Sequence, residues 1–324
     1  MMKKANLPLR ADRKPGRATA IRTVFLSLAL IFVLLCPGIT LAQENTAPEP
    51  HTLQNSPAAP HVALAAEASS DPDDETKEKK FFFTVYRPNY FLGFTYNDHP
   101  NEATYTQAGR EVPNNYEAKF QLSFKIRLKR NLIFGQGDLY AAYTQASWWQ
   151  IYDTSAPFRE TNYEPELFLR FNTDFPVLAG LRNKEVHIGF VHQSNGQGGD
   201  FSRSWNRVYL EFIARKGNFM LALKPWYRVP ESATTDDNPD INEYLGYGKI
   251  YGAYKLSNLV FSFALHNNLH WNENRSGIEL GLSYALQSNL RLYLQYYNGY
   301  GESLIDYNNF TNRIGAGIMI NDWL

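Results

Sequence analysis

The chain has 324 residues, with 32 basic and 32 acidic side chains, 15% aromatic residues and a mean hydropathy of −0.41. Outside the N-terminus it contains no run of about 18 apolar residues, so no transmembrane helix is expected in the mature protein. A membrane β-barrel is not excluded, because its strands are apolar only at every second residue.

The first 42 residues are predicted to be a secretory signal peptide. Basic residues precede the apolar core VFLSLALIFVLL (Val24–Leu35), and Thr40-Leu41-Ala42 provides a small-residue cleavage site. The alternative is an uncleaved membrane anchor. Cleavage would remove the only cysteine, Cys36, and with it any disulfide, thiol nucleophile or cysteine-based metal site. It would also leave 25 basic and 31 acidic residues, a balance that disfavours a nucleic-acid partner.

Two segments of different composition follow the signal peptide. Residues 43–80 are rich in proline, alanine, serine and charge, which predicts a disordered segment. Residues 81–324 are expected to form one strand-rich domain, without a convincing helical stretch.

Apolar and polar residues alternate throughout this domain, most clearly in FQLSFKIRL (120–128). We count about twelve such segments of around ten residues, the length a tilted strand needs to cross a bilayer. The alternate positions carry many charges. The pattern predicts an all-β fold, a twelve-stranded antiparallel transmembrane β-barrel with lipid outside and a polar interior. Because alternation does not say which face is inside, a soluble periplasmic or secreted β-protein is the alternative.

The links between the predicted strands alternate in length. If both termini lie in the periplasm, the links after odd strands face outward. These are residues 97–115, 150–162, 195–204, 230–243, 270–276 and 299–311. The opposite links, such as 215–218 and 256–258, are mostly shorter. The hairpin FVHQSNGQGGDFSRSWNRVYLEF (190–212) therefore turns at the outer surface.

Three polar residues of this hairpin fall on its apolar face. Two-residue steps place His192 and Ser194 on the same face as the apolar residues of the first strand, and Asn206 on that of the second. The apolar residues are Val186, Ile188 and Phe190 in the first strand, and Val208, Leu210 and Phe212 in the second. The antiparallel return lets Asn206 lie near His192. A hydroxyl nucleophile, an imidazole base and a group that orients the imidazole are sufficient for acyl transfer.

The hairpin and the sequence around it closely resemble the outer-membrane phospholipase A family. The resemblance rests on HQSNG (192–196), SRSWNR (202–207), FRETNYEPELFL (158–169), YTQASWWQ (143–150), KPWY (224–227), TDDNPDI (235–241) and GYGESLIDYN (299–308). It implies that His192 is the base, Ser194 the nucleophile and Asn206 the orienting residue in the hydrolysis of phospholipid and lysophospholipid acyl esters. It also implies the cell outer membrane as the location, with the active site at the outer leaflet.

The resemblance further implies a Ca²⁺ ion held largely by neutral oxygens. Its ligands would be the Gln197 carbonyl, the Ser202 hydroxyl and, from the partner subunit of a dimer, the Ser155 carbonyl. Asp237 matches a further ligand of the monomeric form. The Gly196 amide would complete the oxyanion hole.

The resemblance also implies a dimer, because Gln145 matches a glutamine that forms a hydrogen bond across the dimer interface of the family.

The sequence departs from the family at Gln197, where Arg is usual, and at Asp200, which stands one position later than expected. TTDDNPD also has a longer lead-in, PESATT. The change at Gln197 is tolerated because the expected calcium ligand there is the backbone carbonyl.

The competing function is that of a non-enzymatic porin or channel, which would share the barrel, the leader and the charged interior. A secreted soluble esterase is the third candidate.

Overall fold

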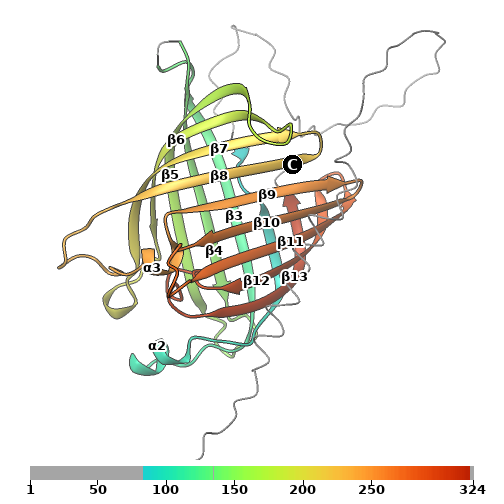
Figure 1. Cartoon of the computed structure of the whole chain (residues 1–324). Coiled ribbons are helices and arrows are strands. Elements are labelled where there is room, and N and C mark those ends of the chain that lie inside the picture. Colours follow the sequence, from blue (N-terminus) through green and yellow to red (C-terminus); the bar gives the residue numbers. More distant parts are fainter. Residues whose placement is uncertain (1–82, 134, 322–324) are drawn as a thin grey trace, which may run out of the picture. The chain divides into compact units, whose positions relative to one another are not determined.

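The computed structural model describes residues 83–133 and 135–321 (Figure 1). The predicted signal peptide and the predicted segment 43–80 lie outside these residues. The elements are β1 (Thr84–Val85), β2 (Asn89–Asn97), α2 (Glu102–Gln107), β3 (Tyr116–Lys129), β4 (Asp138–Trp149), β5 (Phe158–Pro176), β6 (Arg182–Ser194), the 3-10 turn η1 (Gly199–Phe201), β7 (Ser204–Lys216), β8 (Phe219–Val229), α3 (Asn242–Leu245), β9 (Gly248–Leu256), β10 (Leu259–Asn267), β11 (Ser276–Gln287), β12 (Leu290–Gly299) and β13 (Thr311–Asn321).

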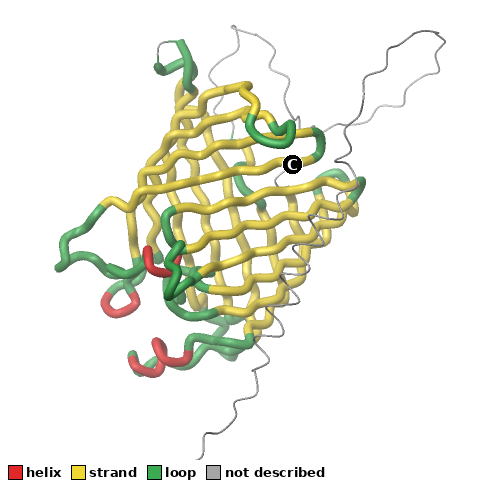
Figure 2. The backbone as a smooth tube through the Cα atoms, viewed as in Figure 1, coloured by secondary structure: helices red, strands yellow, loops and turns green. Residues whose placement is uncertain are grey.

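The strands close into a single barrel. Strands β2 to β13 each pair antiparallel with the next, and β13 returns to pair with β2, with Ile314 opposite Tyr96. The two residues of β1 add to the free end of β3. The predicted twelve-stranded antiparallel barrel is confirmed. The tube in Figure 2 shows the strands wrapping round a common axis. In the described residues no helix is both long and apolar enough to span a membrane.

Two short helices and a 3-10 turn occur where the sequence predicted no helix. Helix α2 begins after Asn101, whose side chain accepts a hydrogen bond from the Thr104 amide and so caps the helix. Helix α3 is a single turn. Both lie in long links at the same end of the barrel (Figure 1). Hydrophobic periodicity does not reveal helices this short.

The two faces of the barrel wall are inverted relative to a soluble protein. Large apolar side chains on the outside are about half exposed, including Leu122, Leu167, Ile188, Leu223, Leu292 and Ile314. Charged side chains are buried in the interior, including Glu117, Lys119, Glu166, Arg207, Glu211, Lys224 and Arg313. This is the arrangement of a barrel that is surrounded by lipid and filled with paired polar groups.

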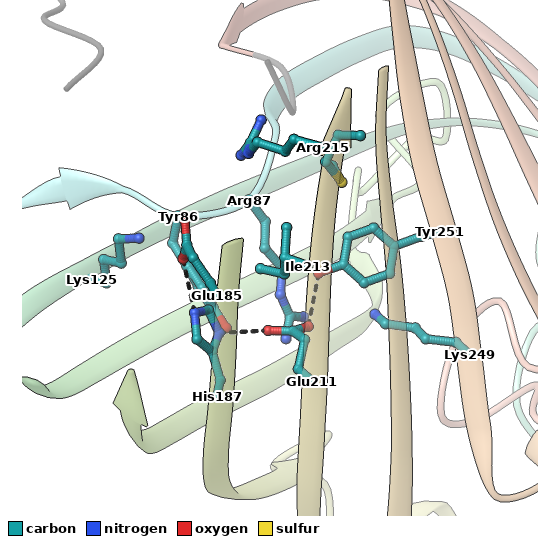
Figure 3. A pocket seen from close by; sticks show the side chains of 11 residues that line it. Tyr86, Arg87, Lys125, Glu185, His187, Glu211, Ile213, Arg215, Lys249 and Tyr251 are labelled. Atoms are coloured by element: carbon teal, nitrogen blue, oxygen red, sulfur yellow. Dashed lines mark hydrogen bonds and ion pairs between the residues drawn. The ribbon is translucent and has the colours of Figure 1, made fainter. Parts of the chain in front are cut away.

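Ion pairs and hydrogen bonds connect the interior charges. His187 lies between two carboxylates, with Nδ1 2.7 Å from Glu211 and Nε2 3.1 Å from Glu185 (Figure 3). Tyr251 donates to Glu211 at 2.8 Å. These side chains line a cavity of about 120 Å³ inside the barrel. Many of the buried charges thus have an oppositely charged neighbour, for example Glu166 with Lys224 and Glu117 with Arg313, which offsets the cost of enclosing them.

The links also differ in length between the two ends of the barrel. The links that follow β2, β4, β6, β8, β10 and β12 span 98–115, 150–157, 195–203, 230–247, 268–275 and 300–310. Those at the opposite end are shorter on the whole, down to two residues at 217–218 and 257–258. The hairpin of β6 and β7 therefore turns at the long-link end, and its link lies among the other long links.

Candidate functional site

Register places the candidate residues of β6 and β7 opposite one another. His192 pairs with Asn206, and Ser194 pairs with Ser204. Ile188 and Phe190 lie on the same face of β6 as His192 and are 45% and 44% exposed. Val191, on the opposite face of the strand, is 1% exposed. His192, Ser194 and Asn206 therefore share the outer, apolar wall of the barrel near its long-link end.

The imidazole of His192 is oriented by a chain of two hydrogen bonds. His192 Nδ1 lies 2.9 Å from Asn206 Oδ1, and Asn206 Nδ2 donates to Glu231 Oε1 at 3.3 Å. Because Glu231 takes the amide hydrogen, the Asn206 oxygen faces the ring and can only accept. Nδ1 then carries the proton and Nε2 is left as the basic nitrogen.

Ser194 lies two residues beyond His192 on the same face, roughly 6.6 Å along the strand. Tyr163 of β5 is its other cross-strand neighbour. Within the described residues, its hydroxyl forms no hydrogen bond. Contacts between a nucleophile and its base often shorten only when substrate is bound.

Gly196 follows Ser194 closely and has a backbone that favours glycine. Its φ is +66°, and a Cβ there would lie 3.0 Å from the Tyr163 ring. Residues with a side chain rarely adopt this conformation. The turn therefore brings the Gly196 amide to the same part of the wall as the candidate nucleophile.

The predicted calcium ligands belong to three of the long links, 150–157, 195–203 and 230–247. Ser202 Oγ donates to Asp237 Oδ2 at 2.6 Å, so a hydroxyl and a carboxylate from different links are in contact. Gln197 is half-buried in the same link as Ser202, and Ser155 is exposed in the link 150–157. Within the described residues no group of three or more histidine, cysteine, aspartate or glutamate side chains is placed to hold a metal ion. The contact between Ser202 and Asp237 fits a hard cation that binds oxygen.

The link 195–203 rests on an apolar cluster formed by three links. Phe201 packs edge-on against Tyr105 of α2, with ring centroids 5.3 Å apart, and both contact Ile305. Burial raises the pKa of Tyr105 to about 12, so its hydroxyl stays neutral. The link 195–203 is therefore packed, through Phe201, against buried, uncharged side chains of two other links.

Two ion pairs of Arg159 hold this cluster in place. Arg159 lies 2.5 Å from Asp306 and 2.9 Å from Glu117. Burial alone would raise the pKa of Asp306, but Arg159, Ser303 and Asn101 outweigh it and lower that pKa below its usual range. The carboxylate is thus charged and fixed at neutral pH, which anchors the link 300–310 to β5.

Gln145 lies on the outer wall in the same cross-strand row as Ser194. It pairs with Tyr163, which in turn pairs with Ser194. Inside this chain its side chain accepts a hydrogen bond from Tyr143 at 3.0 Å and contacts Ser147 at 3.2 Å. Its amide therefore faces the surroundings of the barrel rather than the interior.

Sequence reasoning missed Glu231 and Tyr163. Glu231 belongs to the link 230–247, and nothing in the sequence fixes where a residue in a long link will lie. Tyr163 could have been found from register, since it is the residue of β5 opposite Ser194.

The fold is that of a membrane-type β-barrel, and a serine, a histidine and an asparagine (Ser194, His192 and Asn206) lie near one another on its outer wall. A family model described as phospholipase A1 matches residues 66–320. The phospholipase A1 of Escherichia coli strain K12 is 41% identical over 297 residues, which cover 90% of this chain and 97% of that protein.

Two solved structures are also similar. One is the Salmonella typhi outer-membrane phospholipase, a dimer with bound calcium, with a TM-score of 0.68 and 41% identity over 76% of this chain and 95% of that one. The other is an asparagine-to-alanine active-site mutant of the Escherichia coli outer-membrane phospholipase A, with a TM-score of 0.69 and 41% identity over 77% of this chain and 96% of that one. The chain belongs to the phospholipase A1 family.

Proposed function

We propose that this chain is a calcium-dependent outer-membrane phospholipase A that hydrolyses acyl esters of phospholipids and lysophospholipids. The observation that carries the proposal is the hydrogen bond between His192 and Asn206, two strand residues from Ser194 and on an apolar outer wall. A site in that position faces acyl chains, so the surrounding lipid is the substrate. The long-link end would lie at the outer leaflet.

The chemistry follows from the orientation of the His192 ring. Asn206 holds Nδ1 protonated, so Nε2 accepts the proton of the Ser194 hydroxyl as its oxygen attacks the acyl carbon. His192 then delivers that proton to the leaving lysophospholipid oxygen as the ester bond breaks. In the second half, His192 takes a proton from water as the water oxygen attacks the acyl-enzyme carbonyl. His192 then returns that proton to the Ser194 oxygen as the acyl–oxygen bond breaks and the fatty acid leaves. The Gly196 amide donates to the developing oxyanion.

The Asn206 assignment also draws on a relative, since an asparagine-to-alanine variant of the Escherichia coli protein is an active-site mutant. Asparagine orients the ring without placing a full negative charge at a membrane boundary, which would cost more to desolvate.

Calcium would be held by the Gln197 carbonyl, the Ser202 hydroxyl, Asp237 and the Ser155 carbonyl of the partner subunit. Bound there, the ion would supply positive charge next to the developing oxyanion. The bound calcium of the Salmonella typhi relative supports this assignment, as does the contact between Ser202 and Asp237.

We expect a covalently linked dimer to hydrolyse phospholipid much faster than monomer at the same calcium concentration, because Ser155 would complete the calcium site from the partner. The measurement compares cross-linked dimer with detergent-dispersed monomer, at equal numbers of Ser194 sites. Equal rates per site would contradict the assignment of Ser155 and of Gln145 to a dimer interface.

A serine-directed sulfonyl fluoride with a long alkyl chain tests the nucleophile. We expect one label per chain, located by mass spectrometry on Ser194 and lost in Ser194→Ala. Ser204→Ala is a matched control, since Ser204 is the cross-strand neighbour of Ser194 and has no assigned role. Labelling that persists in folded Ser194→Ala, or no label on the wild type, would favour a channel without esterase activity.

A further inference from the structure

Glu160 is a buried carboxylate whose partners are all uncharged. It is the third residue of β5 and is 1% exposed. Among the described residues, no lysine, arginine or histidine lies within ion-pair distance of it, in contrast to the neighbouring Glu117, which binds Arg159 and Arg313. A buried acidic group without a cationic partner is costly, so its hydrogen bonds must hold it.

The two oxygens of Glu160 bind two different links of the barrel. Oε2 accepts from Gln197 Nε2 at 2.9 Å and from Asn195 Nδ2 at 3.3 Å, both in the link 195–203. Oε1 accepts from Asn162 Nδ2 at 2.6 Å and from the Ile305 amide at 3.1 Å. One carboxylate therefore joins the link after β6 to the link after β12.

The residues bound on the first side are the two that flank Gly196. Asn195 is itself fixed, because its Oδ1 accepts from the amides of Gln197 and Arg203 at 3.2 and 3.0 Å. The side chain of Gln197 is held from the other direction by Arg110, which donates to its Oε1 at 3.3 Å. The backbone between Asn195 and Gln197 is thus clamped on both sides of Gly196.

We propose that Glu160 is a positioning residue that orients the Gly196 amide and the Gln197 carbonyl for the reaction. This inference rests on the proposed function, which assigns the amide to the oxyanion and the carbonyl to calcium. Glu160 touches neither substrate nor the reacting atoms. It acts through Asn195 and Gln197, and it transmits the position of the link 300–310 to the site.

The proposal depends on the carboxylate being an acceptor at both oxygens. Glutamine has nearly the same shape but presents an NH₂ group on one side, where it would meet the amide hydrogens of Gln197 and Asn195 or those of Asn162 and Ile305. Losing partners that orient the ligands of a metal typically costs about 10–100-fold in metal affinity or activity.

The test is the variant Glu160→Gln in the full-length protein, with folding checked by the electrophoretic mobility of unheated samples. We expect at least about a tenfold increase in amide hydrogen exchange within residues 195–203, and about a tenfold weaker calcium affinity by titration calorimetry. In kinetics, kcat should fall with little change in KM. Glu185→Gln is the matched control: it lies on β6, at the opposite end from the link, and should change none of these.

A swap separates positioning from general destabilisation. The double variant Glu160→Gln with Gln197→Glu restores a donor opposite an acceptor between these two positions, with the roles exchanged. It should recover part of the protection of residues 195–203, because Asn195 Nδ2 still lacks its acceptor. The proposal is overturned if Glu160→Gln leaves both exchange and calcium affinity unchanged, or if the swap recovers nothing. Hydrogen exchange is measured without any catalytic turnover, so these outcomes do not depend on the proposed function. Failure of the proposed function would be seen separately, as wild-type protein in which a sulfonyl fluoride does not label Ser194.

Discussion

His192→Ala is expected to lower kcat by roughly 10²–10⁴-fold, the usual contribution of a general acid–base, while the barrel remains folded. Without the imidazole nothing accepts the proton of Ser194, and nothing protonates the leaving lysophospholipid. KM should change little, because the ring contributes to proton transfer rather than to binding the acyl chain. The measurement is phospholipid hydrolysis in mixed micelles with saturating calcium, together with the rate of sulfonyl fluoride labelling at Ser194, which should fall in parallel.

The same series tests how the ring is oriented. Asn206→Ala should cost less than His192→Ala, about 10–100-fold, because the base remains but its tautomer is no longer fixed. Asn206→Asp should not restore full activity, since the new carboxylate would face Glu231, which lies 3.3 Å from the amide it replaces. His270→Ala is a suitable control, because His270 is half-buried in the link 268–275 and its side chain pairs only with Glu243 among the described residues. Retention of more than about a tenth of the wild-type kcat in folded His192→Ala would contradict the assignment of the base.

The barrel was predictable because its strands repeat one physical pattern. Each strand is apolar at alternate residues, as at Phe120, Leu122 and Phe124, and the same parity faces outward in the structure. The alternation alone could not decide whether lipid or solvent surrounds the apolar face, and the membrane barrel was favoured by the leader, the aromatic content and the strand lengths. The structure resolves this through buried interior charges such as Glu211 and Lys224. The helices α2 and α3 escaped prediction because they are set by one cap or one turn, not by periodicity.

The candidate site was predictable to the extent that it follows from strand register. The two-residue alternation puts His192 and Asn206 on the same face of an antiparallel hairpin, so Asn206 was expected to lie near His192, and the structure pairs them. Glu231 and Glu160 could not be placed in this way. Each of their contacts, with Asn206 and with Gln197, joins a strand to a long link, and the length of a link does not determine its path.

Gly196→Ala is expected to reduce kcat by about 10²-fold or more, with the calcium affinity less affected than kcat. An alanine at φ +66° costs roughly 1–2 kcal/mol, and its Cβ would lie 3.0 Å from Tyr163 Cε2. The link can relieve both only by turning the peptide, which moves the amide away from the oxyanion. Loss of one oxyanion donor typically costs about 10²–10³-fold in kcat. The measurement is kcat with a soluble ester substrate, so that binding at the lipid interface does not limit the rate.

Gly198→Ala separates this effect from a general stiffening of the link. Gly198 lies two residues further on, has φ −117° and would place a Cβ in open space, so its kcat should stay within about twofold of wild type. Adding Tyr163→Ala to Gly196→Ala removes the close contact but not the backbone strain, so activity should recover only in part if φ is the main constraint. Full recovery would assign the effect to the tyrosine ring. Equal losses in Gly196→Ala and Gly198→Ala would instead show that the link as a whole is sensitive, and that the Gly196 amide has no special place in the oxyanion hole.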